Sequence, residues 1–316
     1  MQKRKLGNTG FDVAPLALGG NVFGWTADEP TSLQVLDAFA GAGFNLIDTA
    51  DAYSTWVPGH KGGESETIIG RWIARRGRHD DVVIATKVGS DMGYGHKNLR
   101  ADYIVQAVER SLRRLHVDAI DLYQSHWDDE KTPFDETLEA HARLVKQGKV
   151  KAIGASNLTA PRLEQALEAS KRHGYPRYET LQPHYNLYER ASFEGPLEDL
   201  CVRERLCVIT YFSLASGFLT GKYRTEADFA KSPRGGSMGK FLNPRGLRIL
   251  AALDDVSRRY AATPAQVALA WLIHRPSVTA PIASATSVAQ VNELIAATRL
   301  NLDTDAIAAL DEASAP

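Results

Sequence analysis

Short apolar runs alternate with amphipathic stretches along the whole chain. We predict eight strands from the apolar runs, at residues 13–20, 44–50, 81–89, 119–127, 150–157, 179–186, 206–214 and 277–285. These runs are almost continuous in apolar residues, which is typical of parallel strands that are covered on both faces.

The stretches between the runs have helical periodicity. Four apolar residues fall on one face of a helix that starts at Ala101: Ile104, Val108, Leu112 and Leu115. Proline early in a first turn indicates helix starts at Thr159-Ala160-Pro161 and at Thr263-Pro264. Gly148 and Gly174 lie where helices are expected to end.

Eight strand–helix alternations within 316 residues are most economically closed into a (β/α)₈ barrel, a TIM barrel of the α/β class. No linker rich in Pro, Gly or Ser divides the chain, so we expect one domain over residues 1–316. The alternating stretch KRKLGNTGFDV, with turn residues Asn8 and Gly10, predicts a β-hairpin before the first barrel strand. A doubly wound sheet stays possible, but GGNVFG (19–24) lacks the GxGxxG spacing which that fold favours.

The composition is that of a soluble globular protein, with 44% hydrophobic and 24% charged residues. A net charge of −1 gives no overall attraction to nucleic acid or to an anionic membrane. No apolar run reaches the roughly 18 residues that span a bilayer, and the N-terminal stretch lacks the apolar core of a signal peptide. Cys201 and Cys207 form neither a disulfide framework nor zinc-ligand spacing. We therefore expect a cytoplasmic protein with no metal, nucleic-acid or membrane partner.

Polar side chains gather where the predicted strands end, which in a barrel of this kind is the rim that carries the active site. The first four are Asp48, Tyr53, Lys87 and His126, and later strands add Ser156, Asn157, Gln182 and Tyr211. Alone, each has an ordinary structural role as a cap, a surface residue or a packed core residue. Together, the first four bring titratable groups from three successive strands to one rim.

This combination suits proton donation to a carbonyl oxygen while another group supplies hydride to the carbon. A tyrosine is a poor acid, with a reference pKa of about 10. We expect the Lys87 ammonium to lower the pKa of Tyr53, and Asp48 to hold that lysine charged and in place. His126 would orient the substrate oxygen.

The chain resembles the aldo-keto reductase superfamily in DTADAY, ATKVG and QSHWD, and the likeness extends over nearly all of its length. The resemblance implies that Asp48, Tyr53, Lys87 and His126 form the catalytic tetrad, with Tyr53 as the acid. It implies reversible reduction of small aldehydes or ketones to alcohols, with hydride from C4 of a nicotinamide.

The same resemblance implies a nicotinamide cofactor that is bound without a Rossmann fingerprint. Ser156 and Asn157 of GASN, with Gln182, would contact the carboxamide, and Tyr211 would stack on the ring. YFSLASGFLTGK is similar to the family's YSPLAxGxLTGK, although Phe212 and Ser213 depart from it. The implied cofactor site is Gly20, Asn21, Asp48, Ser156, Asn157, Gln182, Tyr211, Leu214, Gly217, Lys222, Arg234, Ser284, Thr286, Gln290 and Glu293.

The adenosine end departs from the family pattern. Many relatives have a basic residue in a motif similar to GARxxxQ, where this chain has SATSVAQVNEL with Thr286 in its place. Gln290 and Glu293 fit, while Leu294 replaces a frequent asparagine. The similar potassium-channel β subunits have serine at the Thr286 place and still bind NADP. We expect NADP(H), with charge from Lys222 and Arg234, and NAD(H) stays the open alternative.

Three tryptophans lie on the predicted rim: Trp25, Trp56 and Trp127. They indicate a pocket for a flat or apolar carbonyl compound or for a sugar, or they only close the top of the barrel. We expect the segment 54–65 to shape the entrance and the segment 216–244 to cover the cofactor.

Two other functions compete with the reductase. The first is a redox sensor, similar to a channel β subunit, that holds NADP and acts through a partner protein. The second is a barrel hydrolase, for which the chain shows no paired carboxylates or metal ligands. The complete tetrad favours the enzyme, while the oligomeric state, the physiological substrate and the direction of reaction in the cell cannot be read from the sequence.

Overall fold

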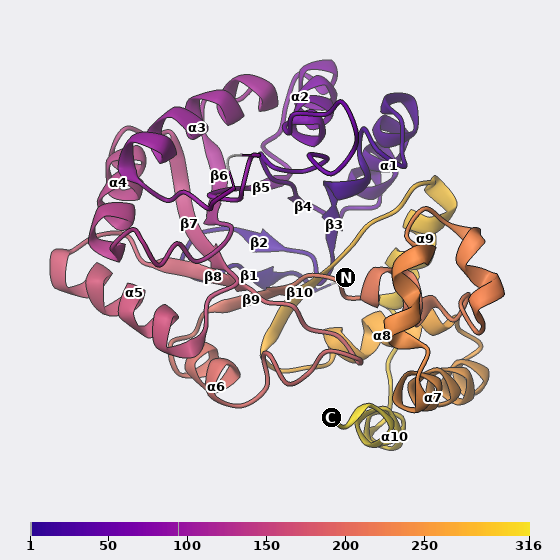
Figure 1. Ribbon diagram of the computed structural model, residues 1–316. Coiled ribbons are helices and arrows are strands. Elements are labelled where there is room, and N and C mark those ends of the chain that lie inside the picture. The colour runs from indigo at the N-terminus through magenta and orange to yellow at the C-terminus, as the bar shows by residue number, and fades with distance from the viewer. Residues whose placement is uncertain (1, 94) are drawn as a thin grey trace.

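Eight parallel strands form a closed barrel in the computed structural model, which describes residues 2–93 and 95–316 (Figure 1). The strands are β3 (Ala17–Gly19), β4 (Leu46–Asp48), β5 (Val83–Val88), β6 (Ile120–Ser125), β7 (Val150–Ser156), β8 (Tyr178–Gln182), β9 (Cys207–Thr210) and β10 (Val278–Ala283). Their order around the barrel is β10-β3-β4-β5-β6-β7-β8-β9. The predicted (β/α)₈ fold is therefore confirmed, and each of the eight apolar runs contributes one strand.

The observed strands are shorter than the apolar runs that predicted them. β3 keeps only three residues, and β9 ends at Thr210 where the run continued to 214. The residues that follow β3 and β9 in these runs leave the sheet and form loops at the carboxyl end of the barrel. Those loops position the side chains described below.

The N-terminal hairpin is present as β1 (Arg4–Lys5) paired antiparallel with β2 (Asp12–Val13). Leu6 and Val13 are fully buried and belong to the same cluster as the residues inside the barrel. The hairpin therefore closes the end of the barrel opposite the predicted site.

Helices surround the barrel (Figure 1). They are α1 (Glu29–Gly41), α2 (Glu64–Arg76), α3 (Ala101–Leu115), α4 (Phe134–Lys146), α5 (Ala160–His173), α6 (Pro196–Arg203), α7 (Pro244–Tyr260), α8 (Pro264–Ile273), α9 (Val288–Ala297) and α10 (Thr304–Ser314). The predicted starts at Ala160 and Pro264 are confirmed, and the cap of α5 is Gly174 in the left-handed conformation that glycine tolerates. Gly148 lies two residues beyond α4, and the four predicted apolar residues of α3 are buried.

The barrel interior changes character along its axis. Leu46, Val83 and Leu122 fill the half nearest the hairpin. Because side chains two residues apart point the same way in a strand, Asp48 and Lys87 also face inward, at the carboxyl ends of β4 and β5. An apolar plug thus lies below a polar layer, and the polar layer is the floor of the site.

Two irregular segments complete that end of the barrel. The turn η1 (Gly20–Val22) follows β3, and the segment after β9 contains three 3₁₀ helices, η2 (Ala215–Thr220), η3 (Glu226–Lys231) and η4 (Gly235–Phe241). No helix in the described part of the chain is long and apolar enough to cross a bilayer.

Candidate active site

Lys87 lies at the centre of a hydrogen-bonded cluster at the end of β5 and is fully buried. Its Nζ donates to Asp48 Oδ2 at 2.8 Å, to the Thr49 carbonyl at 2.7 Å and to Tyr53 Oη at 2.8 Å. An ammonium has three protons to donate, so this geometry satisfies all of them. Burial lowers the pKa of Lys87, and the Asp48 carboxylate opposes that shift.

The Asp48 carboxylate is buried and uses both oxygens. Oδ2 accepts from Lys87 and from Tyr53 Oη at 2.9 Å, and Oδ1 accepts from Gln182 Nε2 at 2.8 Å. The three donors come from β5, from β8 and from the loop after β4. A buried charge is usually hydrogen-bonded in this way.

Tyr53 returns to this cluster because the chain turns tightly after β4. Thr49 N–H donates to the Ala85 carbonyl at 2.8 Å and Asp51 N–H donates to the Lys87 carbonyl at 3.2 Å, so the loop follows β5 beyond the end of the strand. Ser54 has a φ of 75°, in the left-handed region, and ends that turn. The phenol is thereby placed between the lysine and the open cavity.

The expected lowering of the Tyr53 pKa is wrong for this cavity. Burial raises the pKa of Tyr53 well above its usual value, and the neighbouring Asp48 carboxylate raises it further. A phenolate would lose its solvation and face a like charge about one hydrogen bond away. Tyr53 is therefore a neutral phenol that keeps its proton at physiological pH.

His126 follows β6, and its backbone N–H donates to the Val88 carbonyl at 2.8 Å. Its ring centroid is 6.1 Å from that of Tyr53 and 6.0 Å from that of Trp127, on which it stacks. Burial lowers the pKa of His126 well below its usual value, and the charge of Lys87 lowers it further. The ring is therefore neutral at physiological pH.

Asn157 connects the rings on either side of it. Its Oδ1 accepts from Tyr211 Oη at 2.7 Å, and its Nδ2 donates to the His126 carbonyl at 2.9 Å and to Ser156 Oγ at 3.0 Å. Ser156 Oγ in turn donates to the Gln182 carbonyl at 2.7 Å. The residues predicted for the carboxamide site thus form one hydrogen-bonded network. Within it, Asn157 fixes the position of the Tyr211 ring relative to the His126 backbone.

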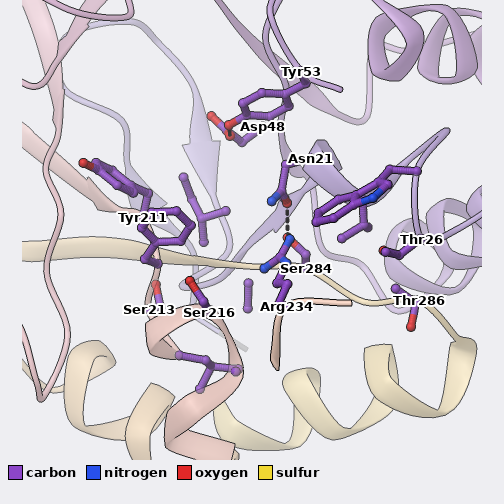
Figure 2. Close-up of a pocket in the computed structure, with 18 of the residues that line it drawn as sticks. Asn21, Thr26, Asp48, Tyr53, Tyr211, Ser213, Ser216, Arg234, Ser284 and Thr286 are labelled. Carbon is purple, nitrogen blue, oxygen red and sulfur yellow. Dashed lines mark hydrogen bonds between the residues drawn. The ribbon is translucent and has the colours of Figure 1, made fainter. Parts of the chain in front are cut away.

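A cavity of about 1060 Å³ opens above these residues (Figure 2). All of the predicted site residues line it except two: Gly20 and Lys87. Lys87 lies beneath Asp48 and Tyr53, and Gly20 packs behind the rim, where its carbonyl accepts from Ser65 Oγ at 2.8 Å. Asn21 and Ser284 do line the cavity and are joined by a hydrogen bond of 2.5 Å, drawn in Figure 2.

Several lining residues were not predicted, including Gly19, Thr26, Ser90, Ser213, Ser216 and Lys231. Ser90 follows the carboxyl end of β5 at the same rim, so reading one residue further would have found it. Lys231 lies in the basic segment 216–244 that the sequence already marked. His184 was also missed, although its ring stacks on Tyr211 with centroids 5.2 Å apart.

The segment after β9 supplies positive charge to the cavity. Lys222, Lys231 and Arg234 all line it. The Arg234 guanidinium lies 5.1 Å from the ring centroid of Trp25, which comes from the loop after β3. Segment 216–244 therefore contacts the opposite wall of the cavity through a cation–π interaction.

The backbone of this segment is unusual next to the cavity. Phe212, Ala215 and Ser216 have φ values of 52°, 47° and 57°, in a region that non-glycine residues rarely adopt, and Gly217 has a φ of 101°. Such conformations cost about 1–3 kcal/mol each and concentrate at functional sites. Glycine adopts this φ without strain, while an added Cβ would lie 3.6 Å from Lys222 Nζ, in ordinary van der Waals contact.

At the far end of the cavity, polar residues of α9 replace the missing basic residue. Thr286 N–H donates to Gln290 Oε1 at 2.8 Å, and Glu293 Oε1 accepts from Thr263 Oγ1 at 2.6 Å. The basic side chains of this cavity therefore come from the segment 216–244, and none comes from α9.

Aromatic rings form the wall nearest Tyr53. Trp25 and Trp56 are in edge-to-face contact with centroids 5.6 Å apart, and Trp56 lies 6.1 Å from the Tyr53 ring. Trp127 lies on the other side of His126. The structure thus brings all three predicted tryptophans to one cavity, and Trp56 is half exposed at its mouth.

The donor set fits a dinucleotide with a flat, amide-bearing ring. The amide network at Asn157, the Tyr211 ring and the cationic pair Lys222 and Arg234 lie along one continuous cavity. Its volume is slightly above the roughly 300–1,000 Å³ that is usual for ligand pockets, as expected for a site that holds a cofactor and a substrate. The phosphates of such a molecule would be held by the cations, and its ring by Tyr211 and the amides.

Comparison with known proteins places this site in a family. The model of the Aldo/keto reductase family matches residues 15–315. The chain is 33% identical to Aldo-keto reductase YhdN of Bacillus subtilis, over 96% of this chain and 91% of that protein. It is 32% identical to Protein tas of Escherichia coli, over 98% of this chain and 97% of that protein. It is 30% identical to a probable voltage-gated potassium channel subunit beta of Arabidopsis thaliana, over 93% of this chain and 90% of that protein.

Proposed function

Because the chain belongs to the aldo/keto reductase family, we propose that this oxidoreductase reversibly reduces aldehydes or ketones to alcohols with NADP(H). One observation carries the proposal. The Tyr53 phenol lies between Lys87 Nζ and Asp48 Oδ2, at the boundary between a buried charge pair and the cavity. Residues 1–316 would act as one domain, and the cytoplasmic setting stays a prediction.

The roles of the four residues follow from this geometry. Tyr53 is the acid that protonates the substrate oxygen. Lys87 donates to Tyr53 Oη and so stabilises the negative charge that grows there as the proton leaves. Asp48 holds Lys87 in place, and the neutral ring of His126 orients the carbonyl. When bound, the cofactor supplies hydride from C4 of its nicotinamide to the carbonyl carbon.

Proton transfer requires one local movement. Tyr53 donates to Asp48 in the structure, so its O–H must rotate toward the cavity to reach a substrate. The carboxylate keeps Lys87 and Gln182 as donors after that rotation. The reverse reaction needs the phenolate, which the raised pKa of Tyr53 disfavours, and alcohol oxidation is therefore expected to accelerate as the pH rises.

The cation set supports NADP(H) over NAD(H). Lys231 is paired with Asp228 at 2.6 Å, which leaves Lys222 and Arg234 as the lining cations without a carboxylate partner among the described residues. Two unneutralised cations in the cavity favour the cofactor with the additional phosphate. α9 has no basic side chain that could bind the additional phosphate. We therefore expect a smaller difference in affinity between NADP(H) and NAD(H) than in relatives with an arginine at the Thr286 place.

A cofactor-consumption assay tests the proposed function. Loss of reduced-nicotinamide absorbance is followed with NADPH and with NADH, over aromatic aldehydes, short aliphatic aldehydes, dicarbonyls and aldoses. Turnover with NADPH, fastest for flat aldehydes that fit beside Trp25 and Trp56, is the expected result. Tight NADPH binding without turnover would contradict the reductase and favour the redox sensor, while no binding of either cofactor would contradict both.

The rate of reduction is expected to be independent of pH through the range where an ordinary histidine titrates. His126 stays neutral because its pKa is lowered well below the usual value of about 6.5, and Tyr53 stays protonated because its pKa is raised. The measurement is kcat for aldehyde reduction between about pH 5.5 and 7.5. An inflection near 6.5 that disappears in His126→Gln would show that His126 titrates as a solvated side chain and would contradict this assignment.

Removing the contact between segment 216–244 and the loop after β3 is expected to release the cofactor faster. In Arg234→Ala the cation–π contact with Trp25 and one phosphate-binding charge are lost, so Kd for NADPH should rise by about tenfold, mostly through the dissociation rate. Arg224→Ala is the matched control, because Arg224 lies in the same segment and bonds Asp254 outside the cavity. Equal effects of the two variants in stopped-flow fluorescence would contradict a specific role for Arg234.

A further inference from the structure

A second hollow, of about 400 Å³, lies on the outside of the barrel and is lined by Thr67, Arg110, Arg113, Arg114 and His116. These residues belong to α2 and to the end of α3, which are neighbours in the outer ring (Figure 1). None of the five lines the cavity above Tyr53. The hollow is therefore a separate feature.

Glycines of α2 and its N-cap build this hollow by letting the two helices approach closely. A Cβ at Gly70 would lie 1.9 Å from the Arg114 carbonyl, so only glycine allows α2 to contact the end of α3 there. A Cβ at Gly63 would lie 2.5 Å from Arg114 Nε, and its absence makes room for the guanidinium. Thr67 also lines the hollow, and its Oγ1 donates to the Gly63 carbonyl at 2.8 Å.

The arginines around the hollow have little negative charge to balance them. Within residues 2–93 and 95–316, Arg110 and Arg113 form no ion pair, and Arg110 contacts only the Tyr103 ring, at 5.6 Å, among the cation–π pairs. The acidic residues of α3 bind elsewhere, Glu109 to Lys149 and Asp102 to Arg100. On α2, Glu64 accepts from the Lys61 N–H at 2.9 Å.

Arg114 is neutralised from the interior side. Its Nε donates to Glu66 Oε2 at 2.7 Å, and Glu66 is fully buried and also accepts from Thr86 Oγ1 at 2.6 Å. Burial raises the pKa of the nearby Asp51 to about 8, so that carboxyl is mostly protonated at neutral pH. Among the described residues, no carboxylate therefore neutralises Arg110 or Arg113 at the opening of the hollow.

A structural role explains only part of this arrangement. Arg113 and Arg114 lie in the last turn of α3, where cations interact favourably with the helix dipole. Arg110 lies one turn earlier, three residues before Arg113, and two like charges on one face of a helix repel each other. Guanidinium groups that converge on a concave space match the oxygen geometry of phosphate.

We propose that the hollow between α2 and α3 binds the phosphate group of a small metabolite, through the guanidinium groups of Arg110 and Arg113. The volume admits a phosphate ester or a diphosphate, and Arg114 forms the inner wall while it stays bonded to Glu66. The site is independent of the cofactor cavity and of the reaction proposed there.

Isothermal titration with inorganic pyrophosphate tests this site, using the full chain saturated with NADP(H) at neutral pH and constant ionic strength. Saturation with cofactor occupies the cations of the other cavity. The expected result is one saturable binding event, weakened at least tenfold in the double variant Arg110→Gln/Arg113→Gln. The matched control is Arg78→Gln/Arg258→Gln, which removes the same charge from exposed arginines elsewhere and should leave the affinity unchanged.

Three outcomes would overturn the proposal. Wild-type protein could show no saturable binding, or the two double variants could lose affinity equally, which would indicate diffuse attraction by net charge. Binding that persists in Arg110→Gln/Arg113→Gln but competes with NADP(H) would locate pyrophosphate in the cofactor cavity. Thermal unfolding of both double variants shows that the fold is retained, and should differ little from wild type because neither removes a buried contact.

Discussion

Tyr53→Phe is expected to lower kcat for carbonyl reduction by about 10²–10⁴-fold, the range for loss of a positioned general acid. The substitution removes the hydroxyl that donates to Asp48 and accepts from Lys87, while the ring keeps its place beside Trp56. Cofactor affinity should change little, because the cations and amides of the cavity are untouched. The measurement is steady-state reduction of an aromatic aldehyde together with fluorescence titration of NADPH.

The control for that variant is Tyr175→Phe. Tyr175 stacks on His173 outside the cavity, so losing its hydroxyl should leave kcat unchanged. Stability of Tyr53→Phe should fall by only about 1–3 kcal/mol, because Lys87 and Asp48 keep each other as partners. Near-normal turnover in Tyr53→Phe would remove Tyr53 from the mechanism, and a loss of cofactor affinity equal to the loss of kcat would assign it a binding role instead.

Lys87→Met is expected to damage both the fold and the reaction. The substitution leaves the Asp48 carboxylate buried with Gln182 and Tyr53 as its remaining donors, and breaking a buried ion pair in this way costs about 3–5 kcal/mol of unfolding free energy. It also withdraws the cation that stabilises the departing charge on Tyr53, so kcat should fall by at least about 10²-fold. Denaturant unfolding and steady-state kinetics measure the two effects.

The double variant Lys87→Met/Asp48→Asn separates these two roles. Asp48→Asn removes the buried carboxylate that Lys87→Met leaves without its cation. The double variant should therefore regain much of the free energy of unfolding that Lys87→Met loses. Activity should not return, since the cation is still missing. Recovery of kcat together with stability would mean that Lys87 acts on the fold alone.

The barrel and the polar cluster could be predicted because both depend on local sequence patterns. Each apolar run became a strand, and the period of two in β4 and β5 places Asp48 and Lys87 inward at the carboxyl ends. The segment DTADAY delivers a carboxylate at the end of β4 and then returns the phenol to the same lysine.

Other features depend on three-dimensional packing and could not be predicted. The direction of the Tyr53 pKa shift depends on how completely the phenol is buried beside Asp48, which no spacing reveals. The stacking of His184 on Tyr211 depends on a parallel bridge between these two residues, which the chain forms beyond the ends of β8 and β9. Lys231 reaches the cavity through a segment of short 3₁₀ helices that has no apolar periodicity to predict it.

The most direct test of the central claim is the fate of the cofactor's hydrogen in a single turnover. NADPH deuterated at the transferred position of C4 is mixed with an aromatic aldehyde and an excess of the protein, and the alcohol is analysed by mass spectrometry. The proposed mechanism gives one deuterium on the carbinol carbon in wild type and almost no alcohol with Tyr53→Phe over the same time. Alcohol without deuterium, or bound NADPH that stays reduced beside unreacted aldehyde, would contradict it.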